Sequence, residues 1–256
     1  MTAEEKNGRR VAILGALSTI AEETARLLAE RGASLALAGR EGGRLDAVAA
    51  DLRLRGARVV TTHALDLAAA PNKQARLEEM AAGLGGLDVV LLFYGALGDQ
   101  ARANDDLDEV RRLIEVNFTS AAEWMTAGAA LLKASPAPRP VLLAVSSVAG
   151  DRGRRSNYVY GAAKGGLSIF MQGLAHRLVA EGKTRAVAMK LGFVKTAMTA
   201  HLNPKGPLWA EPEDVARAIV GAMDRGGPIV YAPSFWRFIM LAVRATPAAI
   251  FNKVNL

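Results

Sequence analysis

Apolar and polar residues alternate between two patterns along the chain: short runs of β-branched and aliphatic residues, and longer stretches with helical periodicity. The short runs predict strands at residues 10–14, 34–38, 58–62, 88–93, 141–145, 184–191 and 228–231. The longer stretches predict helices at residues 21–31, 44–55, 71–84, 107–132, 158–181 and 212–224. Strands and helices that alternate in this way are typical of an α/β fold. We therefore expect a doubly wound parallel sheet of about seven strands with helices on both faces.

The length and composition fit a single domain. The 256 residues are 51% apolar, which is enough to fill one substantial core. The last predicted strand ends at Tyr231, so residues 232–256 are not needed to complete the sheet. We expect a catalytic domain over residues 1–231 and an apolar, basic extension of that domain over residues 232–256.

Composition disfavours several kinds of site and partner. The chain has no cysteine, and His63, His176 and His201 do not have the spacing of metal ligands, so no metal is expected. Residues 1–10 are polar and no apolar run could span a bilayer, so we expect a cytoplasmic protein. The net charge of +7 favours phosphorylated cofactors, anionic substrates or anionic lipid surfaces. No nucleic-acid recognition motif accompanies that charge, so nucleic acid is not an expected partner.

Candidate chemistry gathers between residues 146 and 164. Ser147 precedes Tyr160 by thirteen residues, and Lys164 follows Tyr160 by four, so the phenol and the ammonium share one face of a predicted helix. A fixed positive charge beside a phenol lowers the pKa of the phenol, which predicts that Tyr160 donates and accepts a proton. Tyr158 is a poor rival because Ala162 stands four residues later. The alternative is a Tyr–Lys pair on the surface.

These three residues resemble the catalytic Ser and Tyr-x-x-x-Lys set of the short-chain dehydrogenase/reductase family, and the resemblance extends over about residues 9–231. It implies a Rossmann-like fold and an NAD(P)-dependent oxidoreductase that acts on CH–OH or C=O groups. In such an enzyme Tyr160 protonates the substrate oxygen, Ser147 positions it, and Lys164 binds the nicotinamide ribose. Asn117 would bend its helix and hold a water that links Lys164 to solvent; the alternative is an asparagine bonded to its own helix backbone.

The same resemblance assigns residues to the cofactor. The family's first turn reads TGxxxGxG, whereas this chain keeps only the first glycine. The turn and the helix after it still offer backbone N–H groups to a pyrophosphate. The cofactor-binding residues implied are Gly15, Ser18, Thr19, Ile20, Arg40, Asp66, Gly95, Tyr160, Lys164, Val194 and Thr196.

Individual positions in that set carry separate expectations. Arg40 ends the second predicted strand, where family members that use NAD carry an acid, so it favours NADP (NADPH) over NAD; the alternative is a solvated arginine. Asp66 would lie beside the adenine or serve as a turn residue. Gly95 is the remaining glycine of an Asn-Asn-Ala-Gly motif and would allow close approach of the cofactor. Val194 and Thr196 align with residues that contact the nicotinamide carboxamide.

Features outside these motifs bear on the substrate. Arg152, Arg154 and Arg155 could steer a phosphate-bearing substrate or form a solvated loop edge. Residues 197–210 resemble a substrate-covering loop, in which we expect His201 to be structural. The aromatic, basic segment 232–256 could contact a membrane surface, its own domain or a partner subunit.

The expected function is NADPH-dependent reduction of a ketone. Within the family, residues 150–167, 194–208 and 229–254 resemble a branch that reduces keto-sugars carried on lipid phosphates. The alternatives are a simple ketone, an acyl thioester or a steroid-like substrate, or a non-catalytic NADP-binding sensor. A membrane-surface interaction module is a third class. The helices at 107–132 and 158–181 resemble those through which family members form homodimers.

Overall fold

Seven parallel strands form one sheet in a computed structural model that describes residues 8–202 and 206–253. The strand order is β3-β2-β1-β4-β5-β6-β9. The strands are β1 (Arg10–Leu14), β2 (Ser34–Gly39), β3 (Val60–Ala64), β4 (Val89–Leu92), β5 (Val141–Ser147), β6 (Arg185–Leu191) and β9 (Ile229–Ala232). The predicted α/β architecture is confirmed.

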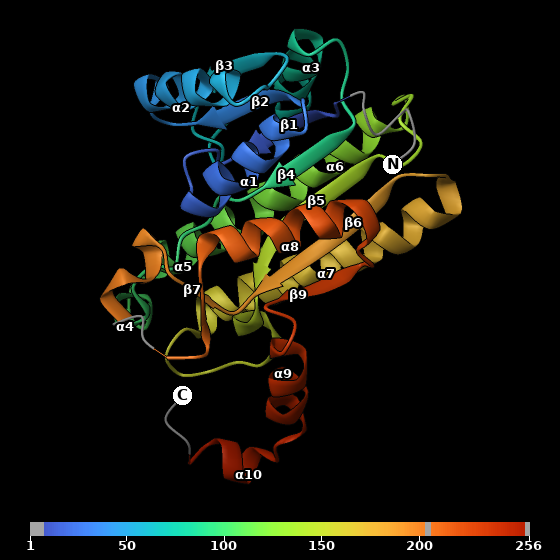
Figure 1. The fold of residues 1–256 in the computed structure, drawn as a ribbon. Helices are drawn as coiled ribbons and strands as arrows, with labels where there is room; N and C mark the ends of the chain where they lie inside the picture. Colours follow the sequence, from blue (N-terminus) through green and yellow to red (C-terminus); the bar gives the residue numbers. More distant parts are fainter. Residues whose placement is uncertain (1–7, 203–205, 254–256) are drawn as a thin grey trace.

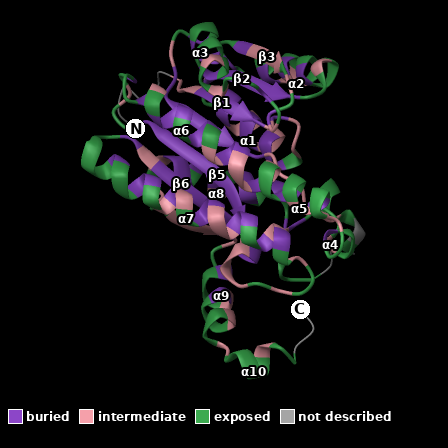
Figure 2. Ribbon diagram, turned by 180° about the vertical axis from the view of Figure 1, so that it is seen from behind, coloured by how far each residue is buried: buried purple, intermediate pink, exposed green. Residues whose placement is uncertain are grey.

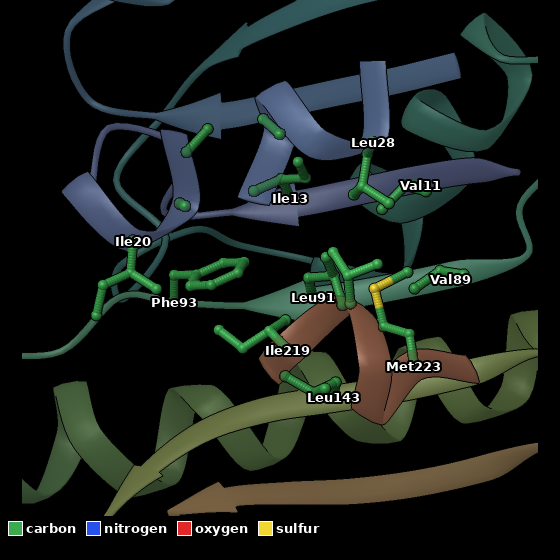
Figure 3. Close-up of a cluster of buried hydrophobic side chains, with 14 of the residues drawn as sticks. Val11, Ile13, Ile20, Leu28, Val89, Leu91, Phe93, Leu143, Ile219 and Met223 are labelled. Atoms are coloured by element: carbon green, nitrogen blue, oxygen red, sulfur yellow. The ribbon is translucent and has the colours of Figure 1, made fainter. Parts of the chain in front are cut away.

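Helices cover both faces of this sheet (Figure 1). One face carries α1 (Thr19–Glu30), α2 (Gly42–Leu54) and α8 (Pro212–Arg225), and the other carries α3 (Lys73–Gly83), α6 (Ser120–Leu132) and α7 (Tyr158–Glu181). Because both faces of the sheet are covered, its central strands are largely apolar rather than alternating, whereas the edge strand β3 carries Thr61, Thr62 and His63 and is partly exposed. On the first face, Val11 and Ile13 of β1 and Leu91 of β4 pack with Leu28 of α1 and Ile219 of α8 (Figure 3).

The parallel register brings all the carboxyl ends of the strands to one edge of the sheet. Leu14 pairs with Leu92, and Leu92 pairs with Ala144, so β1, β4 and β5 end close together. Ligands of open α/β sheets bind in the crevice outside the carboxyl ends of the strands, which makes this edge the place to look for a site.

Element boundaries differ from the predicted ones by a few residues. Strand β5 continues two residues beyond 145, so Ser147 ends a strand rather than lying on the loop after it. The predicted helix 107–132 is interrupted: α5 (Leu107–Ile114) passes into a π-helical turn, η1 (Glu115–Thr119), before α6. Such turns inside α-helices bend them and are frequent at functional sites.

Several short elements at the carboxyl edge were not predicted. They are α4 (Gln100–Ala103), the 3-10 turns η2 (Val148–Asp151) and η3 (Ala197–Leu202), and a small pair of strands, β7 (Phe193–Val194) and β8 (Trp209–Ala210). Each lies in a loop that follows a strand of the main sheet, so together they build the surroundings of the crevice.

The C-terminal extension forms two helices, α9 (Trp236–Ala245) and α10 (Ala248–Phe251), that project from the body of the molecule (Figure 1). Trp236 and Met240 are buried against Val148, whereas most of the two helices is exposed (Figure 2). In the described part of the chain, no helix has the length and apolar character needed to cross a membrane. The extension thus packs on the body through one face of α9, while most of its other side chains are exposed to solvent.

Candidate active site

A cleft of about 820 Å³ opens at the carboxyl edge of the sheet. Its walls come from the segments after β1, β4, β5 and β6. Nine of the predicted site residues lie in these walls: Ser18, Thr19, Ile20, Gly95, Ser147, Tyr160, Lys164, Val194 and Thr196. The topology therefore brings together residues that are up to 178 positions apart in the sequence, from Ser18 to Thr196.

Tyr160 and Ser147 both line the cleft, and hydrogen bonding with Ser147 acts to lower the pKa of the phenol. Burial acts more strongly in the opposite direction, so the pKa of Tyr160 lies above its ordinary value. The Nζ of Lys164 lies 6.0 Å from the centre of the Tyr160 ring. The expectation that Lys164 holds the pKa of Tyr160 below the ordinary value is thus wrong, because desolvation dominates.

Lys164 is only 4% exposed, and its Nζ donates to the carbonyl oxygen of Val145 at 3.1 Å. Burial disfavours the charged ammonium and lowers the pKa of Lys164 to about 8. A lysine in this state exchanges its proton near neutral pH, unlike a lysine in solvent. The alternative of a surface Tyr–Lys pair is excluded by this burial.

Asn117 lies in the π-helical turn, fully buried, beside the loop that carries Gly95. Its Nδ2 donates to the carbonyl oxygens of Ala96 and Leu113 at 2.8 and 2.9 Å, and its Oδ1 accepts from Ala96 N at 3.0 Å. Asn117 thus bonds to its own helix, as the alternative held, and also fixes the loop after β4. The water relay stays a prediction.

Gly95 lies between Asn117 and Lys164 and needs to be glycine. A Cβ at this position would lie 2.8 Å from Asn117 Oδ1 and 3.2 Å from Lys164 Nζ. A side chain here would displace one of the two groups. The close approach also shows that Asn117 and Lys164 are neighbours across the backbone of Gly95.

The turn after β1 has the features of an anion site. Gly15 has a φ of +89°, and a Cβ there would meet Tyr94 N at 2.7 Å, so the single retained glycine is the one that this turn requires. Helix α1 begins at Thr19, and its N-cap residue Ser18 makes no side-chain capping bond. The first N–H groups of α1 and the hydroxyl of Ser18 are therefore not bonded to each other, and Ser18, Thr19 and Ile20 line the cleft, an arrangement that fits a pyrophosphate.

Arg40 and Asp66 lie outside the walls of the cleft. Arg40 is exposed at the end of β2, and in the described part of the chain its side chain has no hydrogen bond or ion pair. Its neighbour Glu41 pairs with Arg44 instead. The Oδ1 of Asp66 accepts from Ala68 N and Ala69 N at 2.9 and 3.4 Å, so Asp66 serves as a turn residue; a contact with adenine stays a prediction.

The segment after β6 closes the cleft. Thr199 Oγ1 accepts from Thr196 N at 3.2 Å and donates to the carbonyl oxygen of Val194, which fixes the backbone of the two residues predicted to contact the cofactor. Met198 and Leu202 also line the cleft and are largely exposed. The side chain of His201 and residues 203–205 lie outside the described residues.

Sequence reasoning missed a wall formed by residues 97–101. Asp99 Oδ1 accepts from Ala101 N and Arg102 N, and so starts the short helix α4. Gln100 accepts from Val159 N at 3.1 Å and thereby ties this wall to the helix that carries Tyr160. An aspartate directly before a short run of good helix formers, here Gln100–Ala103, is the signal of such a cap, and it was available in the sequence.

The three arginines of the loop after β5 have separate environments. Arg152 Nη1 donates to the carbonyl oxygens of Val243 and Thr246, and its guanidinium lies 3.8 Å from the centre of the Phe251 ring. Arg152 therefore holds the C-terminal extension and is not free to steer a substrate. Arg154 lines the cleft, whereas Arg155 is exposed and lies outside its walls.

Comparisons with known proteins agree with this geometry. The sequence pattern of the family described as short chain dehydrogenase matches residues 9–206. An uncharacterized oxidoreductase of Mycobacterium tuberculosis is 36% identical over 244 residues, which cover 95% of this chain and 96% of the relative. An uncharacterized oxidoreductase of Streptomyces coelicolor is also 36% identical, over 250 residues that cover 96% of each chain.

Solved structures give the same result. A protein described as a short-chain dehydrogenase of Shigella flexneri, complexed with NADP, has a TM-score of 0.78 and 25% identity, with 88% of this chain and 96% of that one covered. The 3-oxoacyl-[acyl-carrier protein] reductase of Brucella melitensis, in complex with NAD, has a TM-score of 0.75 and 26% identity, with 88% and 95% covered.

Proposed function

The chain belongs to the short-chain dehydrogenase/reductase family and is an NAD(P)-dependent oxidoreductase, and we propose that it reduces a ketone with NADPH. The observation that carries this proposal is the convergence of Ser147, Tyr160 and Lys164 in the wall of one cleft. The turn at Ser18–Ile20 supplies an anion site in the same cleft.

The protein's own residues would supply binding, orientation and the proton. NADPH, when bound, provides the hydride that is added to the carbonyl carbon. The pKa of Tyr160 is raised by burial, so the phenol is protonated at neutral pH and can give its proton to the carbonyl oxygen. Ser147, hydrogen-bonded to the phenol, would hold that oxygen. Lys164, with a pKa of about 8, would restore the proton to the resulting phenolate.

The residues available for the cofactor favour NADPH over NADH. Gly15, Ser18, Thr19 and Ile20 would hold the pyrophosphate through the start of α1. Arg40, cationic and without a side-chain partner in the described part of the chain, would pair with the 2′-phosphate at the end of β2. Solved relatives bind either NADP or NAD, so the preference rests on Arg40 itself.

For the substrate we favour a keto-sugar on a lipid phosphate. Residues 150–167, 194–208 and 229–254 resemble those of decaprenylphosphoryl-2-keto-ribose reductase. A lipid chain could lie along the exposed apolar side chains of the segment after β6 and of the C-terminal extension, which are Met198, Leu202, Leu208, Phe238 and Leu241. The extension could also contact a membrane surface. The alternative is a simple ketone, an acyl thioester or a steroid-like substrate.

Assembly as a homodimer is also proposed. The outward faces of α5 and α7 expose large apolar side chains, with Leu107 at 68% and Ile169 at 70%. Burial of such residues against a second copy is favourable. Light scattering at micromolar concentration should give twice the mass of the chain.

The function is tested by NADPH oxidation with a panel of ketones, using Tyr160→Phe as the inactive variant. Loss of the phenol proton donor should abolish turnover and leave the affinity for NADPH within about twofold, since the ring remains. Tyr158→Phe is the matched control, because the hydroxyl of Tyr158 bonds Asn104 away from the cleft. Full activity of Tyr160→Phe would refute the role of Tyr160 as proton donor. Tight NADPH binding by the unaltered protein with no ketone reduced would favour a non-catalytic NADP-binding sensor.

A further inference from the structure

Arg154 lies in the wall of the cleft without a partner for its side chain. The residue is half-buried, its Nε is enclosed, and that nitrogen has no hydrogen-bond acceptor in the described part of the chain. Burial lowers the pKa of its guanidinium, and the charge of Asp151, which acts in the opposite direction, offsets this effect only in part. An unpaired buried donor costs about 1–3 kcal/mol, and more when it is charged. A ligand that accepts from Arg154 would remove this cost.

Asp151 is the carboxylate whose charge acts on Arg154, and it is already engaged by other groups. Asp151 stands three residues earlier, but its oxygens accept from Lys190 Nζ and from the hydroxyl of Tyr231. Asp99 lies in the wall of the cleft, and one of its oxygens caps the start of α4. No ion pair of Arg154 is formed by the described residues, so the guanidinium is available to an anion in the cleft.

Asn157 supplies a second unsatisfied group on the same loop. Asn157 lines the cleft, and its Oδ1 is enclosed and accepts no hydrogen bond from the described residues. Asn157 is the N-cap residue of α7 but makes no side-chain capping bond. The wall thus contains a cationic donor and a neutral acceptor three residues apart, each with an unsatisfied polar atom.

The place of this pair in the fold separates it from the cofactor's phosphates. Arg154 and Asn157 follow β5 and lie on the side of the cleft that carries Tyr160. The anion site at Ser18 follows β1, Arg40 follows β2, and the sheet order places β4 between β1 and β5. The group that Arg154 meets therefore belongs to the substrate.

We propose that Arg154 binds an anionic group of the ketone substrate, while Asn157 accepts a hydrogen bond from a hydroxyl close to that anion. The substrate class is a hydroxy-ketone with a phosphate or carboxylate group. This inference rests on the proposed ketone reductase function and specifies its substrate. It would hold for a soluble sugar phosphate and for a phosphate attached to a lipid.

The test measures binding to the enzyme saturated with NADP⁺, which occupies the cofactor site and allows no reduction. Ribulose 5-phosphate and ribulose form one pair of probes, and acetoacetate and butanone form the other. The unaltered enzyme should bind the anionic member of at least one pair more tightly than the uncharged member. A preference within the ribulose pair indicates a phosphate site, and a preference within the acetoacetate pair indicates a carboxylate site. Arg154→Gln should weaken binding of that member about ten- to a hundredfold, because a charged hydrogen bond is lost, and change the uncharged member by about twofold or less.

Matched variants test whether the change in affinity comes from a general loss of positive charge, from misfolding or from damage to the cofactor site. Arg155→Gln removes one positive charge from the same loop outside the cleft and should leave both affinities unchanged. Arg154→Lys should restore part of the preference for the anion, and Asn157→Leu should weaken ribulose 5-phosphate and ribulose alike. The melting temperature and the NADP⁺ affinity of each variant report on folding and on the cofactor site.

Two results would overturn the inference: no preference for either anion by the unaltered enzyme, or equal losses for charged and uncharged probes in Arg154→Gln. Its failure is distinct from failure of the proposed function. If ketones are reduced but Arg154→Gln weakens charged and uncharged probes equally, the protein is a reductase and the proposed anion site is wrong. If no ketone is reduced but anion binding depends on Arg154, the reductase assignment falls instead.

Discussion

At the scale of single residues, burial acts in opposite directions on the two partners of the proton transfer. It raises the pKa of the Tyr160 phenol and lowers the pKa of the Lys164 ammonium to about 8. Both effects follow from one cause, because a low-dielectric site disfavours each charged form. The result is a phenol that holds its proton and an amine that gives one up readily. This arrangement suits delivery of a proton to a ketone.

Burial of the charged Lys164 side chain lowers the stability of the folded protein at neutral pH, and Lys164→Met should therefore raise that stability. The folded pKa of about 8 lies below the ordinary 10.5, a difference of roughly 3 kcal/mol. Between those values the unfolded chain binds more protons, so stability of the unaltered protein rises with pH across this window. Lys164→Met should therefore lose activity yet melt about 5 °C higher at pH 7, with the gain fading toward pH 10. Calorimetry of the cofactor-free proteins checks this, and a lower melting temperature at pH 7 would contradict it.

Arg40, at the end of β2, is the residue we propose to decide between the two cofactors. Arg40→Asp should exchange attraction of the 2′-phosphate for repulsion and move preference from NADPH toward NADH by about one to two orders of magnitude. The measurement is the dissociation constant of each cofactor by fluorescence titration. Arg40→Gln, which removes the charge without reversing it, should fall between the two. Equal binding of both cofactors by the unaltered protein would rule out Arg40 as the determinant.

At the scale of elements, the sequence predicted the helices and strands that show a regular hydrophobic periodicity. The spacing of Tyr160 and Lys164 placed both on one face of α7, and the apolar runs located each strand of the main sheet to within a few residues. The elements that were missed include α4 and the β7–β8 pair, which have only four and two residues per element and so show no periodicity. The capping residue Asp99 was the one local signal for α4, whereas the pairing of β7 with β8 depends on the fold of the segment between them.

The electrostatics of the site were also beyond the sequence. The Tyr160–Lys164 spacing predicts proximity but not the 4% exposure of Lys164, which depends on β5 and on the loop at Gly95. The role of Arg152 was hidden for the same reason, because its acceptors lie about 90 residues away in the sequence. Burial and distant pairing decide these properties, and both are products of the whole fold.

Arg152 links the loop after β5 to the end of α9. It donates to the terminal carbonyls of that helix, where a positive charge is also favoured by the helix dipole, and it lies over the Phe251 ring. Arg152→Gln should free α9 and α10 and increase amide hydrogen exchange across residues 236–251 about tenfold. Arg155→Gln is the control on the same loop. Unchanged exchange in Arg152→Gln would mean that Trp236 and Met240 alone hold the extension.

At the scale of the whole molecule, the C-terminal extension is continuous with the cleft. Phe193, in the cleft wall, lies 5.4 Å from Trp236 of α9 and 5.0 Å from Trp209 of β8, measured between ring centres. One side of α9 therefore belongs to the body of the enzyme. The other side presents Phe238 at 63% and Leu241 at 57% exposure to solvent. The molecule thus extends an apolar surface outward from its site.

That surface should serve a lipid-like substrate, and Phe238→Ser, Leu241→Ser and Ile250→Ser in one variant test it. All three side chains are exposed, so the variant should fold, whereas deletion of residues 236–256 would uncover Val148. Full burial of each apolar side chain is favourable by about 1.5–3 kcal/mol, and partial burial by less. The variant should therefore lose at least about tenfold in turnover of a long-chain phosphorylated ketone at limiting concentration and keep its activity on a short soluble ketone.

Co-sedimentation with phosphatidylglycerol vesicles should fall in parallel, since Arg237, Arg244 and Lys253 attract anionic lipid only weakly without the apolar contact. Equal losses on both ketones, or unchanged co-sedimentation, would show that the surface meets protein rather than lipid.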